Sequence, residues 1–196
     1  NLITQAGADR VVTVDLHAGQ IQGFFDIPVD NLFSTPIFAR HARKKIKSKK
    51  IICVAPDVGG TERARALGKL LNVGLAIVDK RRPKPGQSQV MNVIGDVKGQ
   101  TCIIVDDIID SGGTIVNAAK ALKSRGAKDV YVYITHGVLS GDAIKKIKNS
   151  VIKNLVITDT IDNVHKTKNV KNIEVLPISG LMLSLIHIWR CRRAME

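Results

Sequence analysis

Residues 103–114 combine acidic side chains with a short turn of small and hydroxyl residues. The apolar run Ile103–Val105 is followed by Asp106 and Asp107, and Asp110 precedes the Ser-Gly-Gly-Thr segment. This pattern predicts a buried parallel strand, a loop and the start of a helix, where a phosphate group is favoured. Because acids repel phosphate, we assign them to sugar hydroxyls or to a divalent metal that a phosphorylated ligand carries. The segment therefore predicts a sugar-phosphate site, and a simple helix cap is the alternative. The residues assigned to this site are Asp106, Asp107, Asp110, Ser111, Gly112, Gly113 and Thr114.

A glycine pair follows a second strand-like run. Residues 50–55 are mostly apolar and lead into Pro56, Asp57, Val58, Gly59 and Gly60. Glycines allow the backbone to approach a ligand closely, so successive amides there can surround a pyrophosphate. A glycine-rich turn without any ligand is the alternative, and the glycine pair alone does not exclude it.

Basic residues and a histidine complete the candidate groups. Lys80 and Arg82 lie in the Pro-containing segment 79–85. By themselves, basic residues on such a loop are usually solvated surface. His17 follows a strand-like run that ends at Asp15, and it would ligate a cation or contact a nucleotide phosphate. A single histidine in this position is more often structural.

The four motifs together resemble the ribose-phosphate pyrophosphokinases, also called phosphoribosyl pyrophosphate (PRPP) synthetases. The segment 106–114 alone is similar to the PRPP loop that this family shares with type I phosphoribosyltransferases. The stretch Asp15-Leu16-His17, continuing into Gln-Ile-Gln-Gly-Phe-Phe-Asp at 20–26, is similar to a signature that phosphoribosyltransferases lack. The resemblance runs from near Asn1 to about Gly180, with the motifs in the family's order.

The resemblance implies a reaction and roles for these residues. The 1-hydroxyl of ribose 5-phosphate would attack the β-phosphorus of Mg-ATP, giving PRPP and AMP for nucleotide biosynthesis. Lys80 and Arg82 would stabilise the transferring group, and Gly59 and Gly60 would bind pyrophosphate. Mg²⁺ is the implied cofactor, with ATP as substrate. Its implied ligands are His17, Asp57, Asp15, Asp26 and Asp30.

Two other functions stay open at this point. One is a type I phosphoribosyltransferase that consumes PRPP, although the element around His17 disfavours it. The other is a non-catalytic regulatory homologue, which would have lost Lys80 and Arg82 or the acids. Either alternative would share the expected fold.

Strands alternate with helices of ordinary length, which predicts an α/β fold with a doubly wound parallel sheet. The resemblance makes this the type I phosphoribosyltransferase kind, preceded by the remnant of a similar domain. We expect residues 1–32 to end a truncated N-terminal domain and 33–182 to form the C-terminal domain. Strands are predicted at 10–15, 50–55, 73–78, 90–94, 101–105, 129–135, 154–158 and 173–177, helices at 33–45, 61–71, 113–124 and 140–147, a loop and helix at 16–25, and a polar loop at 79–89.

Composition narrows the choice of partners. The net charge is +13, but only 4% of residues are aromatic and no nucleic-acid module is recognisable. No apolar run has membrane-spanning length. Cys53 and Cys102 lie in apolar runs without a metal or disulfide spacing. We therefore expect a cytoplasmic protein without nucleic-acid or membrane partners, and the resemblance implies a homo-oligomer, the family's hexamer.

The last residues differ in composition from the rest of the chain. Residues 183–196 hold the only Trp, the third Cys and several arginines. Leu183–Ile188 resembles the translation of a transposon-derived sequencing adapter. We expect this segment to be a non-native tail, and it is excluded from the fold prediction.

Overall fold

The computed structural model describes residues 2–81 and 90–193. Its centre is a seven-stranded sheet in the order β5-β4-β3-β6-β7-β8-β9. Only β5 at one edge runs antiparallel to its neighbour. The strands are β3 (Ile51–Ala55), β4 (Gly74–Arg81), β5 (Val90–Ile94), β6 (Thr101–Ile109), β7 (Asp129–Gly137), β8 (Asn154–Thr158) and β9 (Ile173–Leu176). This confirms the predicted α/β fold with a doubly wound, mainly parallel sheet.

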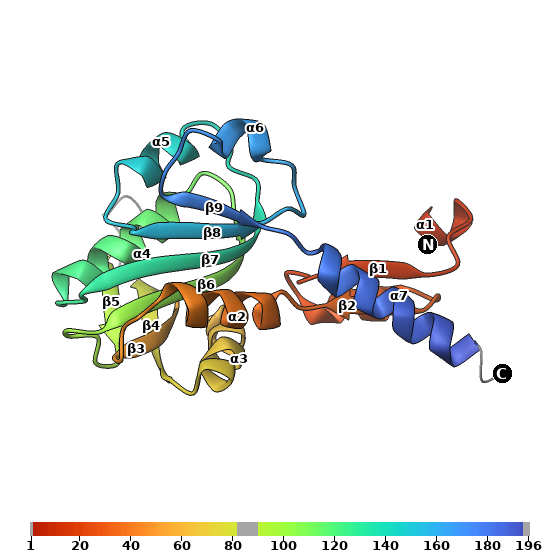
Figure 1. The fold of residues 1–196 in the computed structure, drawn as a ribbon, viewed down its shortest axis with the longest axis horizontal. Coiled ribbons are helices and arrows are strands. Elements are labelled where there is room, and N and C mark those ends of the chain that lie inside the picture. The colour runs from red at the N-terminus through yellow and green to blue at the C-terminus, as the bar shows by residue number, and fades with distance from the viewer. Residues whose placement is uncertain (1, 82–89, 194–196) are drawn as a thin grey trace.

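Helices cover both faces of this sheet (Figure 1). On one face, α2 (Thr35–Lys45) and α3 (Thr61–Leu71) pack through Phe38 and Leu67. On the other face lie α4 (Gly113–Ser124), α5 (Ala143–Lys148) and the short α6 (Val164–Thr167). Successive residues of β6 alternate between the two cores, Ile103 facing the first and Ile104 the second. The sheet is thus buried on both sides, as expected for parallel strands.

A smaller unit projects from the carboxyl ends of the strands (Figure 1). It contains α1 (Leu2–Gln5) and the two parallel strands β1 (Val11–Val14) and β2 (Val29–Leu32), joined through the 3₁₀ helix η1 (Gly19–Phe24). The helix α7 (Ser179–Arg193) runs beside this two-stranded sheet. No helix within the described residues is long and apolar enough to cross a membrane.

Most predicted elements are confirmed, but β2 and α6 were not predicted and two strands extend further than predicted. The strand predicted at 101–105 continues to Ile109, so Asp106 and Asp107 belong to β6 rather than to a loop. Likewise β4 extends to Arg81, so residues 79–81 are strand where a loop was predicted. Pairing with β7 and β5 extends these polar segments beyond the apolar runs that marked them. The remainder of that predicted loop, 82–89, lies outside the described residues.

Candidate functional site

The site lies where the connections of the sheet change direction. From β3 the chain passes through α3 to β4, and from β6 it passes through α4 to β7 on the opposite face. Ligands of open α/β sheets bind beyond the carboxyl ends of the strands at such a switch point. A cavity of about 480 Å³ opens there, between the segments that follow β3 and β6. It is lined by His17, Asp57, Gly59, Gly60, Arg63 and all residues from Asp106 to Ile115.

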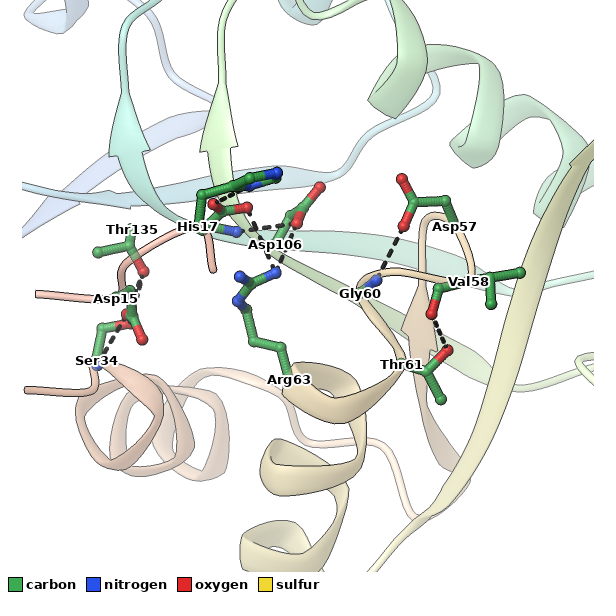
Figure 2. A network of polar contacts seen from close by, with 11 residues as sticks. Asp15, His17, Ser34, Asp57, Val58, Gly60, Thr61, Arg63, Asp106 and Thr135 are labelled. Carbon is green, nitrogen blue, oxygen red and sulfur yellow. Dashed lines mark hydrogen bonds and ion pairs between the residues drawn. The ribbon is translucent and has the colours of Figure 1, made fainter. Parts of the chain in front are cut away.

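Two adjacent acids, an arginine and a histidine form the polar wall of this cavity, and Figure 2 shows Asp106, Arg63 and His17 close to one another. The Arg63 guanidinium lies 2.9 Å from Oδ1 of Asp106 and 3.4 Å from Oδ1 of Asp107. His17 Nδ1 lies 2.8 Å from Oδ2 of Asp107. The Asp107 side chain is only 4% exposed, whereas that of His17 is 82% exposed. Residues from three parts of the chain therefore meet at Asp107.

The environment drives the pKa values of the two acids apart. Burial, together with the hydrogen bond and negative charge of Asp107, raises the pKa of Asp106 to about 7. Burial of Asp107 also disfavours its charge, but hydrogen bonds with Asp106 and His17 and the charge of Arg63 outweigh it and lower the pKa of Asp107. Near neutral pH the pair therefore holds one firm negative charge and one group that exchanges its proton.

The turn between β6 and α4 forms the opposite wall. Gly112 has φ +74° and immediately precedes α4, which a residue with a side chain would rarely do. Its carbonyl accepts the N–H of Val116 at 3.0 Å, which closes the first turn of the helix. The first N–H groups of a helix have no intrahelical partner, so they are available to an anion in the cavity.

The loop after β3 brings Asp57 to the cavity. Asp57 Oδ1 accepts the N–H of Gly60 at 2.9 Å, and Gly60 precedes the first residue of α3. A Cβ added at Gly60 would lie 3.2 Å from Pro56 Cδ, so a side chain there would crowd the loop. The tight loop also fixes the start of α3, whose first turn carries Arg63 toward the acids.

The structure brings only part of the predicted metal set together. His17 and Asp57 line the cavity, whereas Asp15, Asp26 and Asp30 do not. Asp15 is 4% exposed and accepts hydrogen bonds from Ser34 and Thr135. Asp30 forms an ion pair with Arg10 at 2.8 Å, and Asp26 is exposed to solvent. Within the described residues, no group of three or more His, Cys, Asp or Glu side chains is placed to hold a metal ion.

Of the two predicted catalytic cations, the structure describes the backbone of one. The backbone of Lys80 lies in β4, paired with Met91 of β5, while Arg82 lies outside the described residues. Arg63, which sequence reasoning missed, contacts both acids. Its position in the first helical turn after the glycine pair was visible in the sequence, but its partners come from a strand 43 residues further along.

Fold and cavity together define a doubly wound α/β protein in which an acidic pair lies beside two helix-starting turns at the switch point. Residues 82–195, more than half of the chain, match the family model described as the phosphoribosyl synthetase-associated domain. The chain belongs to this family, that of the ribose-phosphate pyrophosphokinases.

Individual relatives agree with this assignment. The ribose-phosphate pyrophosphokinase of Bradyrhizobium diazoefficiens is 61% identical over 95% of this chain and 59% of its own length. That of Agrobacterium fabrum is 59% identical over 93% of this chain, again covering 59% of the relative. The chain thus spans about three fifths of the length of these curated relatives.

Solved structures support the fold. Phosphoribosylpyrophosphate synthetase from Mycobacterium smegmatis superposes with a TM-score of 0.86 at 38% identity, covering 95% of this chain and 60% of that one. Adenine phosphoribosyl transferase from Trypanosoma brucei has a TM-score of 0.50 at 15% identity, covering 74% of this chain and 63% of the other. The second likeness concerns the fold alone.

Proposed function

We propose that this chain forms the ribose 5-phosphate site and part of the ATP site of a ribose-phosphate diphosphokinase. The observation that carries the proposal is the cavity in which the acids of β6 face His17 and lie beside the turn that starts α4. A phosphate group fits the N–H groups of residues 110–114, and the neighbouring acids fit the hydroxyls of the sugar. Family membership favours PRPP formation over the other chemistries that such a cavity allows.

The acids suit a sugar because they differ in proton occupancy. Asp107, with its lowered pKa, accepts hydrogen bonds from hydroxyl groups, and Arg63 and His17 hold it in place. Asp106, with a pKa of about 7, both accepts and donates near neutral pH. Each ribose hydroxyl is also a donor and an acceptor. The pair therefore orients the sugar without placing two full negative charges beside it.

The remaining residues serve the diphosphate donor. Gly59 and Gly60 present the backbone of the loop after β3 to its phosphates, while Lys80 and Arg82 neutralise charge that develops during transfer. The anomeric hydroxyl of ribose 5-phosphate attacks the β-phosphorus of ATP, and AMP leaves. Because the protein performs little covalent chemistry in such reactions, alignment and charge neutralisation supply most of the acceleration.

Asp57 and His17 fit a magnesium ion that arrives with ATP. Mg²⁺ in enzymes is usually held by one or two protein groups together with waters and substrate phosphates. Among the described residues, Asp57 and His17 line the cavity and no larger cluster of metal-binding side chains is present. Two protein groups are the number that such a magnesium ion needs. When bound, Mg²⁺ would neutralise phosphate charge and orient the diphosphate.

Homo-oligomer formation and a cytoplasmic location belong to the same proposal.

The test is ribose 5-phosphate-dependent conversion of ATP to AMP. It uses a chimera of the relatives' full length, with the portion outside this chain taken from the Bradyrhizobium diazoefficiens protein. We expect AMP to appear only when ribose 5-phosphate and Mg²⁺ are both present, and AMP formation independent of the sugar would refute the proposal. Lys80→Ala should lower kcat by about 100-fold, the loss of one electrostatic contact in a transition state, with unchanged unfolding. Lys98→Ala, on a turn away from the cavity, is the control.

A further inference from the structure

The turn that carries His17 is built around a buried carboxylate. Asp15 immediately follows β1 and has φ +45°, a left-handed conformation that residues with side chains rarely adopt. Its Oδ2 accepts hydrogen bonds from the Ser34 N–H at 3.0 Å, the Ser34 hydroxyl at 2.5 Å and the Thr135 hydroxyl at 2.6 Å. Figure 2 shows Asp15 between these two partners, turned away from the acids of β6. With three donors, Oδ2 has no lone pair left for a cation, and the Asp15 carboxylate is buried and does not line the cavity.

The residues around Asp15 are also fixed by hydrogen bonds. The Asp15 N–H donates to Leu32 O at 2.8 Å, and the Leu16 N–H donates to the Asn31 side chain at 3.3 Å. His136 Nε2 donates to the carbonyl of Val14 at 2.8 Å. Residues 14–16 are thus bound either to β2 or to the end of β7, and the next residue is His17.

One partner of Asp15, Thr135, and the acids of β6 lie on adjacent strands of the main sheet. Thr135 and His136 lie in the last residues of β7, and His136 pairs in register with Ile108, the residue after Asp107. A turn attached to the end of β7 therefore has a defined position relative to Asp107 on β6. His17 is 82% exposed, so little packing holds its side chain, and its position depends on the attachment of its backbone and on its hydrogen bond with Asp107.

We propose that Asp15 is a positioning residue rather than a metal ligand. Its carboxylate joins the β1–β2 unit to Thr135 of the main sheet, and this attachment sets His17 against Asp107. The unfavourable φ angle persists because several hydrogen bonds over-determine it, as strained residues at functional sites require. For its effect on turnover the inference rests on the proposed function, but its effect on the His17 side chain does not.

The first experiment needs no substrate, metal or activity. Thr135→Val removes one donor to Asp15 and keeps a β-branched strand residue. We expect the imidazole NMR signals of His17, assigned with His17→Gln, to shift in the metal-free chain and amide exchange at residues 15–17 to rise at least tenfold. Thr167→Val is the matched control, because it removes one buried hydroxyl-to-carbonyl hydrogen bond in α6, away from Asp15. Unchanged His17 signals in Thr135→Val would overturn the proposal.

Asp15→Ala separates an anchor from a metal ligand. The anchor predicts that this variant alters the His17 signals before any metal is added, because Ala offers no acceptor for the three hydrogen bonds that Oδ2 accepts. A ligand role predicts unchanged metal-free signals and weaker binding of added Mn²⁺, which would overturn the proposal. Asp26→Ala is the control, since Asp26 is an exposed acid of the same sequence motif.

The second experiment asks whether the anchor acts through His17. In the full-length chimera, Thr135→Val should lower kcat about tenfold, consistent with a small misplacement of a positioned group. In a His17→Ala background the same change should alter kcat less than twofold, because the residue that it positions is gone. An equal tenfold loss of kcat in both backgrounds would show that Asp15 does not act through His17 and would overturn that part of the proposal. A chimera without any ribose 5-phosphate-dependent AMP formation would refute the proposed function, while the metal-free spectra would still decide the anchor.

Discussion

Asp106 and Asp107 are neighbours in sequence, yet their side chains experience different surroundings. Arg63 contacts both, but only Asp107 also has His17 at 2.8 Å. Asp107 therefore keeps its charge, and its charge in turn makes ionisation of Asp106 unfavourable. Pairs of acids with divergent pKa values are a recurrent arrangement in active sites. Here the pair gives the cavity one acceptor that is charged near neutral pH and one that gains or loses its proton there.

Asp106 should make the folded state less stable as pH rises. Its pKa is about 7 in the folded chain, against an ordinary value of 3.8, so between these values the folded state holds a proton that the unfolded state has lost. The lowered pKa of Asp107 acts in the opposite direction, toward lower pH. We expect the stability of Asp106→Asn relative to the native chain to increase from pH 4 to 7 and then level off. The increase should be below about 4 kcal/mol, since one pKa unit corresponds to about 1.4 kcal/mol.

Urea unfolding of both chains at half-unit pH intervals measures this difference. Asp110→Asn, a change to an exposed acid in the same cavity, is the control for the loss of one carboxylate. A stability difference that stays constant from pH 4 to 8 would contradict the raised pKa of Asp106.

Most residues that line the cavity could be predicted from sequence because they lie in short local motifs. The acids of β6, the turn at 111–114 and the glycine pair all lie at the cavity, as local spacing predicted. Arg63 was missed because its role depends on the pairing of β3 with β6, which brings α3 beside the acids. Asp15 lies in a sequence motif together with His17, but sequence alone could not show that its carboxylate is buried against Thr135.

At the scale of elements, the start of α4 depends on one glycine of a pair. Gly112 has φ +74°, whereas Gly113 is the first helical residue and an added Cβ there would meet nothing within 4 Å. Gly112→Ala should destabilise the chain by about 1–2 kcal/mol, the usual cost of the left-handed conformation for a residue with a Cβ. Gly113→Ala should be neutral or stabilising by up to about 1 kcal/mol. Urea unfolding measures both, and calorimetry with ribose 5-phosphate should show weaker binding for Gly112→Ala. Equal stabilities of the two variants would contradict the backbone argument.

Helix α3 contributes the cation that compensates the acids. Arg63 is 18% exposed, so Arg63→Met would leave the buried Asp107 without a full countercharge. We expect a loss of about 3 kcal/mol, typical when one partner of a buried ion pair is removed. In an Asp106→Asn background the loss should be smaller, because less negative charge remains to be compensated. Urea unfolding at pH 7.5 measures the four chains, and Arg65→Met, an exposed residue of the same helix, is the control. Additive losses would contradict the coupling of Arg63 to Asp106.

Helices were predicted more accurately than the ends of strands. The bounds of α3 and α4 agree with prediction because a glycine precedes each and the apolar spacing continues to the end. The strand β2 was missed because Val-Asp-Asn-Leu has no strong strand pattern, and only pairing with β1 makes it a strand. Strand ends depend on hydrogen bonds to neighbours, and those neighbours are distant in sequence.

At the scale of the whole molecule, the site is divided between two units. The main sheet supplies the acids, the two phosphate-type loops and Arg63, whereas the β1–β2 unit supplies His17. The core of the main sheet begins with Phe38 of α2, shortly after β2 ends. The predicted division at residues 32 and 33 stays a prediction. His17 belongs to the smaller unit but lines the cavity of the main sheet. The attachment of the smaller unit therefore affects the cavity.

The helix α7 contributes little to either unit. Leu183, Ile186 and Ile188 are all more than two fifths exposed, and none of the described residues of α7 belongs to the buried core. The Arg10 guanidinium lies 4.7 Å from the centre of the Trp189 ring. A cation–π contact at an exposed site is worth about 0.5–1 kcal/mol. The two buried cores of the main sheet therefore contain none of the described residues of α7.

A chain that ends at residue 182 should accordingly fold as the longer one does. Its free energy of unfolding should change by no more than about 1 kcal/mol, because the lost contacts are mostly exposed. Calorimetry should give the same ribose 5-phosphate affinity, since none of the described residues of α7 lines the cavity. Trp189→Ala in the full chain is the control for the single ring contact and should account for most of any loss. A truncated chain that fails to unfold cooperatively in urea would show that residues 183–196 belong to the native domain and would contradict their interpretation as a non-native tail.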